Sequence, residues 1–500
     1  MERAFTEHAF TERAYGAMTM NNNKLNSVHL IPLSFLGAIL IGTLFLILPV
    51  SSAAGQWTPP IDALFTATTS VCVTGLVVVD TYSHWSLFGQ AVILVLIQIG
   101  GLGVITVVST LMLIAHKRFS LSARLMLRDA MNLDSLEGLL SFLARVIRGT
   151  LIVELAGALL YMIAFIPRFG IARGIWVSVF NAISAFCNAG MDILGPDSLM
   201  SYRSDPLVLL VTMTLIVMGG LGYVVWFDIT GKITGELPKA REKAVSGGID
   251  DFDLSATDLP VSEPKKPILE RFSFKNLTEH TKLVLNLTVG LILAGTVFVF
   301  LAEFNNPETL GAMSMPMKIL NSMFESVTFR TAGFASIPQG GLREVSCIAG
   351  CFLMFIGGSP IGTAGGVKTT TFYFYFLNIT SYIKGQNSAN VYKHSVSPDR
   401  MMKATAIVEV SMGTVLLFTM LLVATNPVGL TDGLFEVMSA CATVGLTRGL
   451  TPLLNTAGKL IIIVAMYLGR IGPISMALFF TGGRKEEMKV HYPDGNFFIG

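Results

Sequence analysis

Long charge-poor stretches are the feature that most restricts how this chain can fold. Four of them predict membrane-spanning helices: Ile31–Val50, Leu151–Phe165, Leu283–Leu301 and Ala404–Ala424. Hydrophobic residues make up 52% of the 500 and charged residues only 14%, so the chain is far more apolar than an average soluble protein. We therefore expect an all-α polytopic membrane protein whose partner along most of its surface is the lipid bilayer.

Charge distribution predicts how the chain is oriented. Eight long apolar segments divide it into alternating compartments, and Lys and Arg concentrate on one side when the N-terminus is placed inside, as in the loop from Lys117 to Arg148. This predicts cytoplasmic N- and C-termini in the cytoplasmic membrane. The polar start lacks the pattern of a cleaved signal peptide. The five cysteines do not indicate a disulfide framework, and nucleic acid is not an expected partner because no basic run carries interleaved aromatic residues.

An internal repeat organises the apolar segments. Four segments share a Phe, a stretch of small residues and then a Gly: Phe65–Leu76, Phe180–Met191, Phe324–Phe334 and Phe435–Leu446. Their glycines are Gly75, Gly190, Gly333 and Gly445. A short segment precedes each glycine, such as Pro60–Thr69 or Leu430–Ala440, and it is too short to cross a bilayer. We predict re-entrant pore helices.

The apolar segment after each of these glycines carries a second repeated motif. Its four copies are Ile99–Gly103, Met218–Gly222, Ile356–Pro360 and Leu468–Gly472. Close helix packing is an alternative explanation for the paired glycines, but it does not explain the short re-entrant segments. The predicted organisation is a cytoplasmic tail at 1–27, repeat 1 at 28–115, repeat 2 at 145–230, a cytoplasmic linker at 231–280, repeat 3 at 281–377, repeat 4 at 403–482 and a cytoplasmic tail at 483–500.

The glycine-centred loops have the composition of a cation filter. Irregular backbone at membrane depth must line a water-filled path or be buried in protein, and its carbonyl oxygens can replace the hydration shell of a cation. The predicted filter residues are Val73, Thr74, Gly75, Asn188, Ala189, Gly190, Thr331, Ala332, Gly333, Thr443, Val444 and Gly445. None is charged, which suits a weakly hydrated monovalent ion better than a divalent one. Asp80 and Asp192 follow two of the loops and either concentrate cations at the outer mouth or are solvated loop acids.

These residues resemble the Trk/Ktr/HKT superfamily of potassium transporters over about residues 28 to 500. The similarity lies in TSVCVTGLVVVDT, TFRTAGF, ATVGLTRGL and IGGSPIGTAGGVKTTT, and the ending HYPDGNFFIG resembles the Ktr-type membrane subunit. The resemblance implies four helix–pore loop–helix repeats around a pseudo-fourfold pore, a homodimer, and a cytosolic ring of nucleotide-binding regulatory subunits. It also implies that nucleotide acts only through that partner, and that sodium dependence is common. A Gly in every filter goes with potassium in this superfamily.

Two features predict control of the pore. The segment Gly357–Gly366 cannot stay helical, because it is rich in glycine and contains a proline. Its predicted gating residues are Gly357, Gly358, Ser359, Pro360, Gly362, Gly365 and Gly366, with Lys368 and Arg470 as associated cations. Arg470 takes the place of the second glycine of its motif, and a charge at membrane depth indicates function: either a conduction barrier that contacts this loop, or a structural hydrogen bond to carbonyls. Lys368 either pairs with a lipid phosphate or the regulatory subunit, or snorkels at a helix end.

The sequence therefore predicts potassium uptake through four backbone loops, gated by the intramembrane loop and the cytosolic subunit. A sodium or mixed sodium/potassium channel is the alternative within the same class. An enzyme or organic-solute carrier would not explain four equivalent loops, and we find no catalytic motif and expect no metal beyond the transported ion. A non-conducting scaffold would be expected to carry broken filters. The N-terminal stretch and the segment Gly235–Lys266 are assigned no role.

Overall fold

The structure is a computed structural model that describes residues 27–104, 106–107, 109, 139–234, 274–386 and 389–472. It is almost entirely helical, as predicted. The predicted N-terminal tail, the C-terminal tail and most of the linker at 231–280 lie outside the described residues, as does the end of repeat 1. The domain boundaries therefore remain predictions.

The described helices follow one order four times: a long helix, a short helix, a loop and another helix. The first group is α2 (Ser27–Ile47), α3 (Pro60–Cys72), α4 (Thr81–His84) and α5 (Leu87–Leu102), with η1 (Pro49–Ser51). The second is α8 (Leu139–Phe169), α9 (Ile171–Cys187), α10 (Pro206–Gly220) and α11 (Tyr223–Thr234), with η2 (Met200–Tyr202). The third is η3 (Phe274–Asn276), α14 (Glu279–Glu303), α15 (Met315–Thr328), η4 (Gln339–Gly341), α16 (Glu344–Phe355) and α17 (Thr369–Ile383). The fourth is α18 (Pro398–Thr425), α19 (Leu430–Cys441), η5 (Thr451–Leu453) and α20 (Thr456–Ile471), preceded by the hairpin β1 (Asn390–Val391) and β2 (His394–Ser395). We refer to these groups as units one to four.

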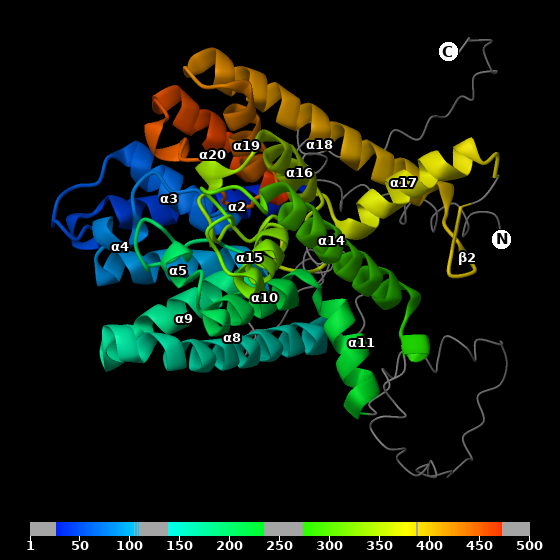
Figure 1. Cartoon of the computed structure of the whole chain (residues 1–500), viewed down its shortest axis with the longest axis horizontal. Coiled ribbons are helices and arrows are strands. Elements are labelled where there is room, and N and C mark those ends of the chain that lie inside the picture. The colour runs from blue at the N-terminus through cyan, green and yellow to red at the C-terminus, as the bar shows by residue number, and fades with distance from the viewer. Residues whose placement is uncertain are drawn as a thin grey trace, which may run out of the picture.

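The first helix of each unit is long and apolar enough to cross a membrane. Among the described residues these candidates are Leu30–Ile47, Ser141–Phe169, Glu279–Glu303 and Pro398–Thr425, which confirms the four stretches expected from the sequence. Their outer faces carry exposed apolar side chains such as Leu44 and Leu301, which are 66% and 70% exposed. Figure 1 shows α8 and α18 along opposite sides of the molecule, with the short helices between them. Such faces suit contact with lipid.

In units one, two and four the last helix differs from the expected continuous span, because it ends or bends at the repeated glycine motif. In unit three the break confirms the prediction that Gly357–Gly366 does not stay helical. α10 and α11 meet at an angle of 99°. α16 ends at Phe355 and α17 begins only at Thr369. α5 and α20 are capped by Gly103 and Gly472, whose φ angles are 87° and 93°. Glycine adopts this left-handed conformation without a steric penalty, so it ends a helix readily.

Close packing also explains the first glycine of each pair. A Cβ on Gly100, Gly219 or Gly469 would lie about 2 Å from a carbonyl oxygen near the end of its own unit's short helix, at Val71, Phe186 and Cys441 respectively. In unit three the same position, Gly357, meets the carbonyl of Gly365 instead. The packing alternative from the sequence is therefore confirmed for the first glycine. The glycine motif thus serves both close packing, at its first glycine, and the break of the helix.

Candidate functional site

The four short helices end where the predicted filter loops begin. α3, α9, α15 and α19 finish at Cys72, Cys187, Thr328 and Cys441. The C-terminal end of a helix carries a partial negative charge, so each of these ends places a potential favourable to cations beside its loop. The apolar faces of the same helices are buried, with Phe65, Phe180, Phe324 and Phe435 all 0% exposed. The repeated Phe is thus the anchor of each short helix in the core.

The backbone of every loop alternates between left-handed and ordinary conformations. The residue two before each glycine has a positive φ although it is not glycine, at 57° for Val73, 58° for Asn188, 69° for Thr331 and 52° for Thr443. The glycines follow at 99° for Gly75, 64° for Gly190, 86° for Gly333 and 98° for Gly445. The residue between each pair is not in this region. Such alternation turns successive carbonyls toward the same side, and it costs energy at the non-glycine positions.

Hydrogen bonds to the short helices hold the loops in this shape. The backbone N–H before each glycine donates to a carbonyl of its own short helix, as Thr74 does to Thr69 and Val444 to Ser439, both at 2.8 Å. In units one and four the glycine N–H also donates to a side-chain hydroxyl, that of Thr69 or Ser439. In units two and three the hydroxyl instead donates to the carbonyl just after the glycine. These hydrogen bonds fix the backbone of each loop to its own short helix.

The four glycines form a closed ring in chain order. A Cβ on Gly75 would lie 2.5 Å from the Ala189 carbonyl oxygen, and one on Gly190 would lie 2.7 Å from that of Ala332. The same distance is 2.3 Å from Gly333 to Val444 and 2.2 Å from Gly445 back to Thr74. Each glycine thus touches the carbonyl of the next unit's loop. Any larger residue would displace an oxygen of the ring, which explains why all four positions are glycine.

No charged side chain belongs to the ring, and all twelve predicted residues come together at it. The hydroxyls of Thr74, Thr331 and Thr443 are buried and have no hydrogen-bond partner among the described residues. The two acids that follow the loops of units one and two have structural partners. Asp80 caps α4 by accepting from the Ser83 N–H, and Asp192 accepts from the Ser198 hydroxyl at 2.6 Å. Asp192 is buried, so the expectation of a solvated loop acid is wrong for this residue. For Asp80 the bond favours neither alternative.

The predicted gate loop lies against the ring and the helix breaks. We call residues 356–368 the gate loop. Its residue Gly365 packs so tightly on unit four that a Cβ there would meet the Thr443 side chain. The N–H groups of Ser359 and Thr363 donate to the carbonyls of Gly220 and Gly219 at 2.8 and 3.1 Å. The loop therefore fills the space between the filter and the break in unit two.

Arg470 contacts this loop, as the sequence predicts. Its Nη1 donates to the Thr363 carbonyl at 2.8 Å, and its Nη2 donates to the carbonyls of Gly100 and Gly101 in unit one. The guanidinium thus connects the gate loop to unit one. All three contacts are hydrogen bonds to carbonyls, as the structural alternative from the sequence expects, and one of them is the predicted contact with the loop. The conduction barrier stays a prediction.

Two further cations bind the gate loop. The Lys368 side chain folds back and donates to the Ala364 carbonyl at 2.6 Å, so the snorkelling lysine expected from the sequence is wrong. Arg330, which the sequence analysis did not single out, is buried in unit three and donates from Nη2 to the Gly357 carbonyl at 3.2 Å. Its place three residues before a filter glycine, inside an apolar segment, was the available signal. Three cationic side chains therefore donate hydrogen bonds to carbonyls that the unwound segment leaves without helical partners.

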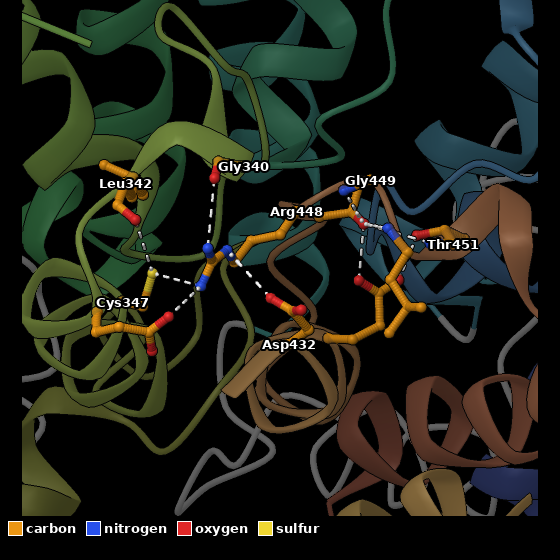
Figure 2. Close-up of polar contacts among 11 residues, drawn as sticks. Gly340, Leu342, Cys347, Asp432, Arg448, Gly449 and Thr451 are labelled. Atoms are coloured by element: carbon orange, nitrogen blue, oxygen red, sulfur yellow. Dashed lines mark hydrogen bonds and ion pairs between the residues drawn. The ribbon is translucent and has the colours of Figure 1, made fainter. Parts of the chain in front are cut away.

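Hydrogen bonds and an ion pair join unit four to its neighbours. Figure 2 shows Arg448, three residues after the unit-four glycine, reaching the Gly340 carbonyl at 3.3 Å and the Cys347 sulfur at 3.1 Å in unit three. Its Nε lies 3.3 Å from Asp432 on α19. The last and first units are joined by a second pair, in which Lys459 Nζ lies 2.6 Å from Asp62 on α3. These contacts link unit four to both of its neighbours and so stabilise the ring of four units.

Comparison with known proteins agrees with this arrangement. A family model described as TrkH, cation transport protein, matches residues 12–244 and 272–491. The chain belongs to this family of cation transport proteins. The resemblance found in the sequence is thereby confirmed, and such a family is one of transporters rather than enzymes.

Several curated relatives match nearly the whole chain. The Ktr system potassium uptake protein B of Bacillus subtilis is 37% identical, over 94% of this chain and 95% of that protein. The potassium/sodium uptake protein NtpJ of Enterococcus hirae is 35% identical, over 95% and 98%. Among solved structures, the crystal structure of the potassium transporter TrkH from Vibrio parahaemolyticus matches with a TM-score of 0.66 at 14% identity, over 92% of this chain and 86% of that one. That likeness supports the fold.

Proposed function

We propose that this chain is the ion-translocating membrane subunit of a potassium uptake system in the cytoplasmic membrane. The observation that carries the proposal is the closed ring of four uncharged, glycine-centred loops, in each of which the N–H before the glycine donates to the loop's own short helix. Backbone dipoles without carboxylates suit a monovalent cation. The relatives named for potassium uptake support potassium as the ion. On this proposal the four units surround one pore with pseudo-fourfold symmetry.

The gate loop and its three cations would control passage. Gly365 of the loop packs against Thr443, and Arg470 and Lys368 donate to loop carbonyls. On this proposal the charges of these two side chains stand in the path of a permeating cation. A positive charge in a low-dielectric path opposes a cation strongly. Conduction then requires the loop to move aside and carry its contacts with it.

The partner proposal follows from the relatives named as Ktr system proteins. We infer that a cytosolic ring of nucleotide-binding subunits, acting on a homodimer of this chain with cytoplasmic termini, biases the gate loop, and that nucleotide binds only to that ring. Co-purification with such a ring, and potassium flux that differs between ATP and ADP, would support this. Equal potassium flux in proteoliposomes with and without the nucleotide-binding subunits would refute it. Protease access to terminal tags in inside-out vesicles tests the orientation.

The test of the filter is potassium uptake by a strain that lacks its own uptake systems and expresses this chain with its partner. Gly75→Ser places a side chain 2.5 Å from a ring carbonyl and should abolish growth on low potassium or admit sodium. Gly290→Ser is the matched control, because Gly290 has nothing within 4 Å of its Cβ position. Rescue by Gly75→Ser equal to that by the wild type would refute the assignment.

A sodium or mixed sodium/potassium channel is the second candidate. The relative named as a potassium/sodium uptake protein favours it. Competition between the two ions during uptake separates the candidates, since a potassium filter is not blocked by excess sodium. Inhibition of potassium uptake by equimolar sodium would select the mixed channel.

A further inference from the structure

Two short helices carry a buried glutamate at the same place. Glu325 and Glu436 directly follow the anchoring phenylalanines of units three and four, and both are 0% exposed. Units one and two have Thr66 and Asn181 there, which are uncharged. A carboxylate at membrane depth is expensive unless it is paired or hydrogen-bonded. The surroundings of the two glutamates can therefore be compared directly.

Glu436 has a donor for each oxygen. The Thr447 hydroxyl donates to Oε2 at 2.7 Å, and the Thr451 hydroxyl donates to Oε1. Both threonines belong to the segment that follows the unit-four filter, part of which is drawn in Figure 2. These two bonds fasten that segment to α19. In unit four the carboxylate is thus a tether for the chain that leaves the filter.

Glu325 lacks both of these donors. Counting from the filter glycine, Ala335 stands in the place of Thr447 and Gln339 in the place of Thr451. The Gln339 side chain lies within hydrogen-bonding range of Glu325, but its Nε2 is aligned with the Ile337 carbonyl, to which it donates at 3.1 Å. Among the described residues neither oxygen of Glu325 has a hydrogen-bond partner, and the same holds for Gln339 Oε1 and the buried Ser336 hydroxyl. Unit three has thus replaced one donor with an alanine and the other with an amide whose oxygen is unpaired.

A third buried acid nearby shows that the difference is specific. Glu303 accepts from the side chains of Asn306, Thr309 and Ser346 and from the Arg343 N–H. It needs nothing further. Glu325 is the acid of this region whose oxygens are left without donors, and buried polar atoms of that kind indicate a bound group.

We propose that Glu325, together with Gln339 Oε1 and the Ser336 hydroxyl, binds a sodium ion between α15 and the segment after the unit-three filter. Oxygen ligands with a single negative charge suit a monovalent cation, whereas a divalent ion would need more acids. A charged carboxylate attracts the smaller alkali ion more strongly, because that ion approaches its oxygens more closely. The ion would do in unit three what two hydroxyls do in unit four. It would be a resident structural ion, separate from the ions in the conduction path.

The test measures sodium binding rather than transport, so it does not depend on the proposed function. Purified protein in nanodiscs is held in constant, saturating potassium chloride, which keeps the filter occupied. Sodium chloride is then added against choline chloride, and radioactive sodium binding and the thermal unfolding midpoint are followed. The wild type and Glu436→Gln should bind one sodium ion and gain stability. Glu325→Gln and Gln339→Leu should lose at least tenfold in sodium affinity.

A transplant keeps the test informative where single variants fold poorly. The double change Ala335→Thr and Gln339→Thr gives Glu325 the two donors found in unit four, so it should be stable without sodium and no longer bind it. Equal sodium binding by the transplant or by Glu325→Gln would overturn the proposal. So would a wild type that gains nothing from sodium but becomes more stable on acidification, which would assign a proton to Glu325. Potassium uptake, scored separately, reports on the proposed function.

Discussion

Removal of the Arg470 guanidinium is the sharpest test of the gate. The side chain makes three contacts, but only the one to Thr363 at 2.8 Å holds the gate loop. The contacts to Gly100 and Gly101 lie on unit one and do not depend on the loop. A hydrogen bond to a charged group contributes about 1.5–3 kcal/mol. Arg470→Ala should therefore raise the ratio of open to closed loop by about 10- to 160-fold.

The assay is rubidium flux into proteoliposomes that contain the chain without a partner, because the closed state should then dominate. Arg470→Lys separates the effect of the charge from that of the hydrogen bond, because lysine keeps the positive charge and loses the planar guanidinium with its two donor nitrogens. If the barrier is electrostatic, Lys behaves like the wild type; if the hydrogen bond holds the loop, Lys approaches Ala. Arg168→Ala is the control, since its ion pair with Asp205 is remote from the loop and Arg168 is 46% exposed. Equal flux through Arg470→Ala and the wild type, at equal reconstitution, would refute the reasoning.

Three further predictions follow from the same contacts. Deleting residues 361–364 removes the part of the gate loop bound by Arg470 and should raise rubidium flux, whereas lower flux with normal expression would argue against gating. Gly333→Ala forces a Cβ to 2.3 Å from the Val444 oxygen at a positive φ and should abolish uptake while leaving the size-exclusion profile normal; retained uptake would mean that the ring does not conduct. Asp62→Asn weakens a pair whose side chains are only 14% and 17% exposed and should lower stability by about 1.5–3 kcal/mol, measured by denaturation in detergent, while Arg168→Ala should cost under about 1 kcal/mol.

The sequence was sufficient to predict the spans and the ring, because both depend on patterns that repeat. The four apolar stretches, the short helices and the four glycines all lie in the structure where the repeat places them. The link between Arg470 and the gate loop was also predictable, since Arg470 breaks the glycine motif. These features are local or periodic, so they can be recognised without knowing distant contacts.

The rest depends on partners far away in the chain. Arg448 binds Gly340 across 108 positions, and Lys459 binds Asp62 across 397. The bend between α10 and α11 depends on how Gly222 packs against the gate loop, which no single segment reveals. Glu325 and Glu436 look alike in sequence, and only the segments folded over them make one satisfied and the other not. Tertiary packing therefore supplies the chemistry that the repeat leaves open.

The way the filter loops are tied down makes the four quarters of the ring unequal. Units one and four secure the glycine N–H with a hydroxyl, while units two and three secure the following carbonyl. A pore built from identical subunits would receive every substitution four times over. In this single chain, one substitution changes only one of the four loops. The two kinds of hydrogen bond divide the ring into two halves, units one and four on one side and units two and three on the other. A single substitution in one of these hydroxyls can therefore change how firmly one quarter of the ring is held, while the other three quarters keep their own hydrogen bonds.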